Sequence, residues 1–450
     1  MARIFGTDGI RGYANSYPMT AEIALKVGMA AAIHLSKNIK GTNRVLIGKD
    51  TRLSGYMFEN ALVAGLTSMG KDVMVVGPIP TPAVAMLTRS TRTDLGIMIS
   101  ASHNPYFDNG IKLFDKNGYK LSDEDEDAIE KLLTEDLTPY LVKSDSIGRV
   151  ERLKESYGRY IEFIKSSFPS NQDLTSLKIV VDCANGAAYK IAPIVLYELG
   201  AEVISVGVSP NGLNINENCG STHIEQLRLK VLETGADVGI SFDGDADRVL
   251  MVDEKGNIID GDKIIAIIAT KLKQEGKLKQ NTVVGTVMAN MGFEKYLDSQ
   301  GIKLLRTSVG DRYVSEGMAR YGLNLGGEQS GHVILSDYNT TGDGLLASLF
   351  ILSYIVEQGE SASKCCKLYE SMPQVLKNMR YTDSSYNNPL ENENIKSFIS
   401  SKQKDFDGKY RILVRKSGTE KLIRVMVEGE SSEETNAIAE EIVSYINSCI

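Results

Sequence analysis

The sequence predicts a multidomain α/β protein, in which three α/β domains precede a smaller α+β domain. Apolar runs of strand length alternate with segments of helical period, which is typical of α/β architecture. A leucine, glycine and valine pattern recurs along the chain, and a polar stretch precedes a shorter strand, strand and helix pattern near the end. The 450 residues suffice for about three domains of ordinary size, with two or four also allowed.

Helix and strand signals alternate through the first 100 residues. Thr20 is a candidate N-cap for an Ala-rich helix that ends near Lys37. Three short apolar runs predict buried strands, and a segment of helical spacing separates the first two. These strands are Arg44 to Gly48, Asp72 to Val76 and Asp94 to Ser100, and the helix is Phe58 to Met69.

A spaced pattern repeats and suggests that the first three domains are related. Leu66, Gly70, Val73, Val76 and Gly77 match Leu196, Gly200, Val203, Val206 and Gly207, 130 residues later, and a weaker copy runs through Leu297, Gly301 and Leu304. In each copy a glycine would end a helix in the left-handed conformation before a strand begins. Any α/β protein can produce such matches, but we expect three related units over residues 1–152, 153–254 and 255–369.

The remaining residues, 370–450, predict the α+β domain. Tyr381 to Lys404 is polar and rich in Asn and Ser, as expected around a linker. Strands are then expected over Tyr410 to Arg415 and Leu422 to Glu428, followed by a helix over Glu433 to Tyr445.

Composition and charge exclude several classes of protein. Hydrophobic residues make up 42% and charged residues 24%, which is ordinary globular composition and not that of a disordered chain. The net charge of −8 is spread without long single-sign runs, so we expect no nucleic-acid partner. The sequence has no signal-peptide pattern and no apolar stretch near the ~18–20 residues that cross a bilayer, so we expect no membrane contact and a cytoplasmic location.

Metal chemistry is expected from aspartates, since the chain offers few softer ligands. The five cysteines form no CxxC motif and there are only four histidines, which disfavours zinc and favours reduced thiols. By contrast, Asp243, Asp245 and Asp247 alternate on a short loop after an apolar strand. Oxygen ligands of this kind suit Mg²⁺ or Ca²⁺. An EF-hand fails because Arg248 stands where its turn needs glycine, and a solvated acidic turn is the remaining alternative.

A second loop, Ser100 to Pro105, follows another buried strand. Ser102 could be a nucleophile, an N-cap or a turn residue, because no G-x-S-x-G motif surrounds it. Lys112 is a nearby cation that could neutralise a reacting oxygen or exchange a proton.

Two further loops combine glycine with polar side chains. Gly326 to His332 offers a carboxylate, an amide and a hydroxyl suited to sugar hydroxyls, although a plain hairpin would also explain its glycines. The segment from Arg415 to Glu420, followed by Arg424, combines guanidinium groups, hydroxyls and a glycine, which could together bind an anion. A basic surface turn is the alternative. Gly65 to Asp72 nearly fits a nucleotide-binding P-loop, but Asp72 replaces the required Ser or Thr and the segment ends a helix.

Together these four loops resemble those of the α-D-phosphohexomutase superfamily, one per domain and in the family's order. The segments Phe5 to Gly12, Asp182 to Gly186 and Val309 to Tyr313, and Gln329 in the third loop, are similar to the branch that acts on glucosamine phosphate. Ala246 and Lys421 depart from the usual pattern, which has glycine and proline there. The resemblance implies mixed sheets and four domains around a central cleft.

The resemblance also assigns residues to roles. It implies that Ser102 carries a phosphoryl group, and that Mg²⁺ is held by this group with Asp243, Asp245 and Asp247. Arg11, Lys112 and Arg248 would add positive charge around the transferring group, with Lys112 or His332 candidates for proton transfer. Substrate-binding residues would be Glu328 and Ser330 for the sugar, and Arg415, Ser417, Gly418, Thr419 and Arg424 for its phosphate.

The implied reaction interconverts glucosamine 6-phosphate and glucosamine 1-phosphate through a 1,6-bisphosphate. Ser102 would be primed by a hexosamine 1,6-bisphosphate or by a kinase, and a homodimer is left open. Two alternatives remain: glucose or mannose phosphate as the substrate, or a non-catalytic sugar-phosphate sensor. A sensor needs no phosphorylatable serine, so Ser102, the loop aspartates and Lys112 argue against it.

Overall fold

The computed structural model describes residues 3–6, 8–38, 41–381, 389–406, 408–416 and 422–449. The chain divides into two compact units, Met1–Met288 with Ile302–Leu368, and Ala289–Gly301 with Tyr369–Ile450. Each unit is described here by itself.

The first sheet of the larger unit is mixed, with strand order β1-β2-β6-β5-β3-β4-β7. Strands β3, β4, β5 and β7 are parallel, whereas β6 and β2 join the β5 edge in antiparallel fashion. Its strands are β1 (Phe5–Gly6), β2 (Gly9–Tyr13), β3 (Arg44–Lys49), β4 (Asp72–Pro78), β5 (Leu95–Ile99), β6 (Asp108–Asp115) and β7 (Val150–Arg152). Its helices are α1 (Ala21–Asn38), α2 (Ser54–Ser68), α3 (Thr81–Ser90) and α4 (Asp123–Leu132).

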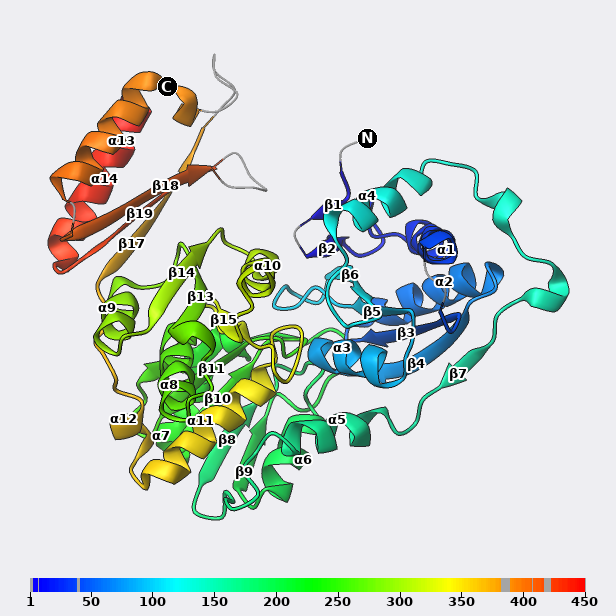
Figure 1. The fold of residues 1–450 in the computed structure, drawn as a ribbon, viewed down its shortest axis with the longest axis horizontal. Coiled ribbons are helices and arrows are strands. Elements are labelled where there is room, and N and C mark those ends of the chain that lie inside the picture. Colours follow the sequence, from blue (N-terminus) through cyan, green and yellow to red (C-terminus); the bar gives the residue numbers. More distant parts are fainter. Residues whose placement is uncertain are drawn as a thin grey trace. The chain divides into compact units, whose positions relative to one another are not determined.

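Helices cover both faces of this sheet (Figure 1). Val45 and Ile47 of β3 belong to the core beneath α1 and α2, while the intervening Leu46 is buried on the opposite side. This alternation follows from the period of two residues in a strand. Because β3 is buried on both faces, its sequence is a continuous apolar run, and this run is what predicted the strand.

The second and third sheets of the larger unit are also mixed. Their strand orders are β12-β11-β10-β8-β9 and β14-β13-β15-β16. In the first of these sheets β11 and β12 pair in antiparallel fashion, and in the second β16 does, whereas the other pairs are parallel. The strands are β8 (Lys178–Asp182), β9 (Glu202–Val206), β10 (Val238–Phe242), β11 (Val249–Asp253), β12 (Ile258–Ile259), β13 (Thr282–Thr286), β14 (Lys303–Thr307), β15 (Leu325–Gly327) and β16 (Val333–Leu335). The helices are α5 (Ser156–Lys165), α6 (Ile191–Glu198), α7 (Ile224–Thr234), α8 (Gly261–Gln274), α10 (Asp311–Tyr321), α11 (Gly344–Gln358) and α12 (Ala362–Cys365).

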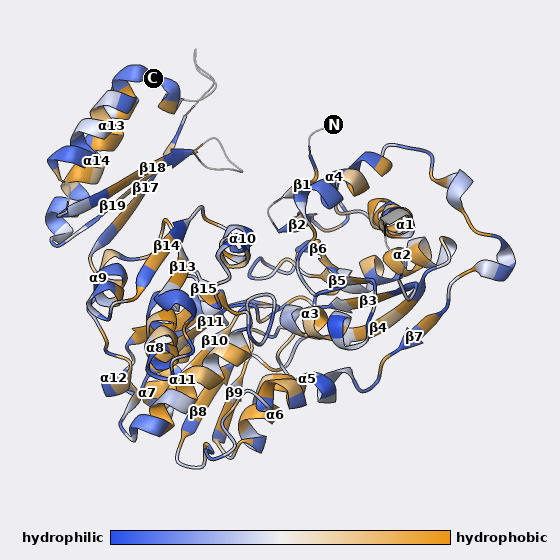
Figure 2. Cartoon of the chain, viewed as in Figure 1, coloured by the Kyte–Doolittle hydropathy of each residue, from blue (hydrophilic) through white to orange (hydrophobic). Residues whose placement is uncertain are grey.

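Helix α11 is the most apolar of the chain's long helices and lies buried between these two sheets. Residues 344–355 are all buried, and the helix packs against α8, β10, β11 and β16. A helix that is apolar on every side must be buried on every side. Figure 2 shows this concentration of hydrophobic residues in α11 and in the central strands.

The smaller unit contains a three-stranded antiparallel sheet of order β17-β19-β18. Its elements are α9 (Met291–Ser299), β17 (Gln374–Arg380), α13 (Glu393–Asp405), β18 (Tyr410–Lys416), β19 (Leu422–Gly429) and α14 (Ser432–Ser448). Helix α9 joins this unit because the Met291 amide donates to the fully buried carboxylate of Glu428, 2.8 Å away.

The interpretation of residues 381–404 as a linker is wrong over its second half. Helix α13 begins after Asn392, whose side chain caps it by accepting from the Asn394 amide. Ile395, Phe398 and Ile399 recur at helical spacing and pack into the core of the domain. The polar remainder of the segment hid this narrow apolar stripe.

The fold class and several local expectations are confirmed. The three α/β sheets are mixed and an α+β domain follows them. Thr20 caps the first helix by accepting from the Ile23 amide, and Gly70, Gly200 and Gly301 all have positive φ. Among the described residues, no helix combines the length and apolarity needed to span a membrane.

The close packing of α1 on α2 depends on two glycines, Gly28 and Gly65. A substitution at this contact therefore tests how much the packing contributes to stability. A Cβ on Gly65 would lie 2.2 Å from the carbonyl oxygen of Leu25, and one on Gly28 would lie 2.7 Å from that of Leu62. Gly65→Ala should therefore lower unfolding stability by about 2 kcal/mol through overpacking. The midpoint of urea unfolding measures the change.

Gly158→Ala in α5 is the matched control. A Cβ there meets no atom within 4 Å, so removing glycine from a helix should raise stability by roughly 0.5–1 kcal/mol. Equal stability of the two variants would contradict the account of the α1–α2 contact.

Candidate active site

Ser102 lies in the loop that follows β5, where its side chain faces the loop that follows β10. Its backbone is left-handed, with φ of +52°, and its side chain is almost fully buried. The Ser102 hydroxyl donates to Asp243 Oδ2 and lies 3.3 Å from Nδ1 of His103. The two loops come from different sheets, and each follows the carboxyl end of its strand, which is where open α/β sheets place their functional groups.

Three aspartates of the β10–β11 loop form a compact acidic cluster. One carboxylate oxygen from each of Asp243, Asp245 and Asp247 lies within 4.8 Å of the others, and all three residues are buried. Asp245 also accepts from the Thr81 hydroxyl at 2.7 Å. The alternation of residues along the loop turns the three side chains toward one point, as the sequence predicted.

Three cations surround the acidic cluster. Lys112 Nζ, at 1% side-chain exposure, lies 2.9 Å from Asp245, 3.3 Å from Asp8 and 3.5 Å from Asp247. Its ammonium is aligned by β6, whose antiparallel pairing places Lys112 opposite Met98 of β5. Arg11 donates to the Ala101 carbonyl at 3.4 Å and pairs with Asp8. Arg248 lies 3.9 Å from Asp247.

Burial and charge shift the acids and bases of this cluster in different directions. Burial, with the charges of Asp247 and Asp245, raises the pKa of Asp243 well above its ordinary value. Burial opposes the shift in Asp247, but Lys112 and His332 hold the pKa of Asp247 well below its ordinary value. Burial also opposes the shift in Lys112, yet its three acidic neighbours raise the pKa of that ammonium.

The two histidines of the site also differ. Burial, with the charges of Arg248 and Arg11, lowers the pKa of His103 to about 4, so its ring is neutral near pH 7. Burial opposes the shift in His332, but Asp247 and Asp311 raise the pKa of that ring. Nε2 of His332 accepts from the Gly342 amide at 3.1 Å, so the neutral ring carries its proton on Nδ1, on the side of Asp247.

The third loop, residues 326–332, lies directly beside the acidic cluster. Arg248 and His332 form an isolated antiparallel bridge, and the Val249 amide donates to the Gly331 carbonyl. Glu328 Oε1 accepts from the Gly310 amide at 3.0 Å, while Ser330 is exposed to solvent. Ser102, Arg11, Lys112, Arg248, His332, Glu328 and Ser330 thus all lie within the larger unit.

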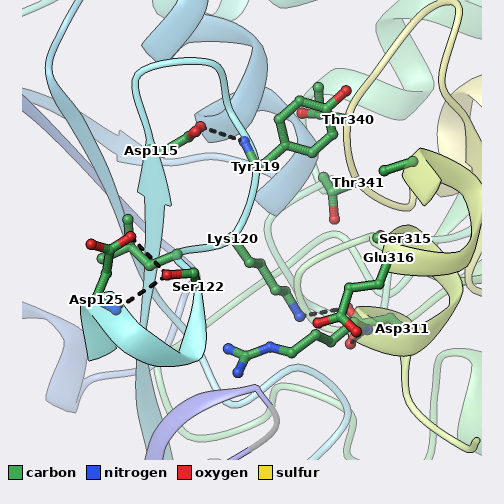
Figure 3. Close-up of a pocket in the computed structure, with 13 residues that line it drawn as sticks. Asp115, Tyr119, Lys120, Ser122, Asp125, Asp311, Ser315, Glu316, Thr340 and Thr341 are labelled. Carbon is green, nitrogen blue, oxygen red and sulfur yellow. Dashed lines mark hydrogen bonds and ion pairs between the residues drawn. The ribbon is translucent and has the colours of Figure 1, made fainter. Parts of the chain in front are cut away.

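Sequence reasoning missed a second layer of charge formed by Asp8, Lys120 and Asp311. Lys120 pairs with Asp8 on one side and with Asp311 on the other, and Asp311 lies 3.6 Å from Nε2 of His332. Figure 3 shows Lys120 extended toward Asp311 on the wall of a cavity of about 290 Å³. Asp8 and Asp311 do stand in the segments that resemble the superfamily, which is the signal that could have found them.

The fourth loop is only partly within the described residues. Ser417, Gly418, Thr419 and Lys421 lie outside them, but the strands on either side place Arg415 directly opposite Arg424. Nε of Arg424 is buried and has no hydrogen-bond partner in the part of the chain that the structure describes. Because like charges opposite one another destabilise a sheet, this arginine pair favours an anionic ligand. This arginine pair belongs to the smaller unit.

The acidic cluster fits a hard divalent cation. Oδ1 of both Asp245 and Asp247 is buried without a hydrogen bond among the described residues. Leaving buried carboxylate oxygens unsatisfied is costly, whereas a cation of oxygen preference would satisfy them together. The donor set is entirely oxygen, which suits Mg²⁺ better than zinc.

Comparison with known proteins identifies the class. Family models of phosphoglucomutase/phosphomannomutase match four successive segments: α/β/α domain I over residues 2–139, domain II over 158–256, domain III over 260–372 and the C-terminal domain over 376–444. The chain therefore belongs to the phosphoglucomutase/phosphomannomutase family, within the α-D-phosphohexomutase superfamily.

Relatives within this family carry a more specific name. The chain is 57% identical to the phosphoglucosamine mutase of Zymomonas mobilis subsp. mobilis over 442 residues, covering 98% of each chain. It is 55% identical to that of Brucella anthropi, covering 99% of this chain and 98% of the other. These alignments cover nearly the whole length of the chain and so include all four matched domains.

Solved structures show the same fold at lower identity. A phosphoglucomutase/phosphomannomutase family protein from Burkholderia thailandensis matches with a TM-score of 0.82 at 22% identity, covering 99% of this chain and 97% of the other. The N-acetylphosphoglucosamine mutase of Aspergillus fumigatus, solved with GlcNAc-6P and magnesium, matches with a TM-score of 0.71 at 18% identity, covering 99% and 95%.

The acidic cluster generates a metal-binding prediction. Asp243→Asn should weaken Mg²⁺ and Mn²⁺ binding by at least about 100-fold, because even residues behind the ligands contribute 10- to 100-fold. The metal-free variant should be as stable as the wild type or more so, since one of three repelling charges is removed. Calorimetry and thermal unfolding with and without Mg²⁺ measure both effects.

Asp237→Asn, at the opposite end of β10, is the matched control and should leave metal affinity unchanged. Wild-type Mg²⁺ affinity in Asp243→Asn would show that the cluster is not the metal site.

Proposed function

We propose that this enzyme interconverts glucosamine 6-phosphate and glucosamine 1-phosphate, with Ser102 as the residue that carries the phosphoryl group. The observation that carries the proposal is the Ser102 hydroxyl, buried and directed at Asp243 in a cluster suited to a divalent cation. Curated relatives named phosphoglucosamine mutase, 53–57% identical over nearly the whole chain, support the same reaction.

The proposed reaction consists of two phosphoryl transfers that reverse one another. In the first, the bond from Ser102 Oγ to phosphorus breaks and a bond forms to the free hydroxyl of the sugar phosphate, whose proton leaves to a base. The product of this half is a 1,6-bisphosphate. After reorientation, the other phosphoryl group returns to Ser102 Oγ, and the sugar oxygen it leaves regains a proton.

Residues of the acidic cluster would hold Mg²⁺, with Asp243, Asp245 and Asp247 joined by an oxygen of the Ser102 phosphoryl group. When bound, this ion would neutralise charge on the phosphoryl oxygens during transfer. Arg11, Lys112 and Arg248 add fixed positive charge nearby. Such preorganised charge stabilises a transition state without reorganising at the moment of reaction.

Proton transfer to and from the sugar hydroxyl is assigned to Lys112 or His332. Lys112 is held in its protonated form by three acidic neighbours, so it is the candidate that would give a proton, or a hydrogen bond, to the departing oxygen. His332 is the second candidate: Nε2 accepts from the Gly342 amide and holds the ring in one orientation, so the proton that this residue would exchange is the one on Nδ1. His103 is neutral and adjoins Ser102, which suits a residue that positions the loop.

Substrate recognition is assigned to the third and fourth loops. Glu328 and Ser330 would hold sugar hydroxyls, or the C2 amine in the case of Glu328. Arg415, Ser417, Gly418, Thr419 and Arg424 would hold the phosphate that does not react, with the facing arginines supplying its counter-charge. Priming of Ser102 by a hexosamine 1,6-bisphosphate or a kinase completes the proposal.

Ser102→Ala tests the nucleophile. The variant should lose at least about 10³-fold in kcat, because the alanine side chain offers no oxygen to carry the phosphoryl group. Peptide mass spectrometry of the purified wild type should find a phosphorylated fraction at Ser102. Ser90→Ala, a serine at the end of α3, is the control and should be fully active. Wild-type-like turnover by Ser102→Ala would overturn the assignment.

Substrate preference tests the sugar. A site that pairs the C2 amine leaves its partner unpaired with glucose or mannose, so kcat/KM for glucosamine phosphate should be at least about tenfold higher, or ~1.4 kcal/mol. The three sugars are compared with one 1,6-bisphosphate activator, so that priming does not appear as specificity. Equal or greater efficiency with glucose or mannose phosphate would replace the substrate but keep the mutase reaction. Binding without turnover of any of them would indicate a sensor.

A further inference from the structure

The carbonyl oxygens of the Ser102 loop are held by two side chains from different parts of the chain. Nη2 of Arg52, at the start of α2, donates to the carbonyls of Ser102 and Asn104. Nδ2 of Asn216, from the segment between β9 and α7, donates to the same two carbonyls at 2.9 and 3.0 Å. Both side chains are buried, Arg52 completely and Asn216 to 6% exposure.

The amide of Ser102 is held as well, by a chain of side chains. It donates to the hydroxyl of Ser100 at 2.9 Å, which in turn donates to the carboxylate of Asp50 at 2.6 Å. Asp50 pairs with Arg52 and accepts from its backbone amide. Both backbone polar groups of Ser102 are therefore bound to side chains that are themselves fixed.

These contacts maintain a strained conformation. A residue with a side chain is strained in the left-handed region, and it keeps that conformation only where the surroundings impose it. The φ of Ser102 determines where its Cβ, and hence its hydroxyl, points. A relaxed loop would turn the hydroxyl away from Asp243.

Arg52 and Asn216, with the carbonyl oxygens of Ser102 and Asn104 that they bind, form a clamp. This clamp also joins the loop that bears Ser102 to the loop that bears the three aspartates, residues 243–247. A Cβ on Gly244 would lie 2.6 Å from the Ser102 carbonyl and 2.9 Å from Nδ2 of Asn216, so the two loops touch through backbone at this point. Among the described residues, the hydrogen-bond partners of the Ser102 hydroxyl are Asp243 and His103, whereas Arg52 and Asn216 bind carbonyl oxygens. The clamp can therefore persist whether or not that oxygen carries a phosphoryl group.

We propose that Asn216 and Arg52 are positioning residues that hold Ser102 in its left-handed conformation, so that its hydroxyl stays aligned with the acidic cluster through both phosphoryl transfers. This inference rests on the proposed function for its kinetic consequence, but the clamp itself does not. Asn216 is the more informative residue to change, since Arg52 carries a fully buried ion pair whose loss would unfold the region.

The experiment compares Asn216→Ala and Asn216→Asp with the wild type. The Asp variant has the same size but sets carboxylate oxygens against two carbonyls, so it should be the more impaired of the two. A small misplacement of a reacting group costs up to about 100-fold, and we expect kcat to fall 10- to 100-fold. KM for glucosamine 6-phosphate should stay within about twofold, because neither Asn216 nor Arg52 belongs to the loops that are assigned to substrate recognition.

Hydrogen–deuterium exchange, followed by mass spectrometry of peptides spanning residues 101–106, measures how firmly the clamp holds this loop. The measurement does not depend on enzyme activity. Exchange should be faster in both variants than in the wild type. Asn214→Ala is the matched control. Asn214 lies in the same segment, and the described residues that its side chain contacts by hydrogen bonds are Asn211 and Ser209, so both exchange at residues 101–106 and kcat should be unchanged.

Each readout can overturn the proposal. Unchanged exchange at residues 101–106 in both Asn216 variants would show that the clamp does not hold the loop. Faster exchange with wild-type kcat, or a loss confined to KM, would show that the clamp does not serve the reaction. A wild type without mutase activity would reject the proposed function, and the exchange data would still decide whether Asn216 holds the loop.

Discussion

The structure depends on keeping three carboxylates together out of water. Asp243, Asp245 and Asp247 have between 0 and 4% exposure, and burial of even one unpaired charge is costly. The surrounding cations, above all Lys112, reduce this cost. So would a divalent ion, for which the unpaired oxygens of Asp245 and Asp247 are available. A cluster that is unstable without such an ion is also one that binds it strongly.

Charges of alternating sign extend from this cluster into the neighbouring domains. Lys112 joins Asp245 to Asp8, Asp8 joins Lys120, and Lys120 joins Asp311, which lies beside His332. Every buried charge along this path has a partner of opposite sign, as the low polarity of an interior requires. The path links the first domain to the start of α10. It therefore connects the loop that bears Ser102 with the third loop, residues 326–332.

The residues assigned to phosphoryl transfer all belong to the larger unit. The acidic cluster and the third loop are joined by the backbone bridge between Arg248 and His332, and the Ser102 hydroxyl donates to Asp243. Arg415 and Arg424, proposed to hold the phosphate that does not react, belong to the smaller unit.

Local patterns in the sequence determined the alternation of strands and helices, the cap at Thr20, the left-handed glycines, and the loops that bear Ser102 and the three aspartates. Each of these follows from residues close together in the chain, where the period of side chains and the conformational range of glycine decide the outcome. The tertiary structure alone decided that Asp8, Lys120 and Asp311 join the site, and that Asn216 reaches the carbonyl of Ser102, 114 residues away. The tertiary structure also decided that the polar segment before β18 contains α13. The narrow apolar stripe of this helix stabilises it only through packing against the sheet of the C-terminal domain. Contacts between distant residues depend on how the sheets pack, and no local pattern encodes that packing.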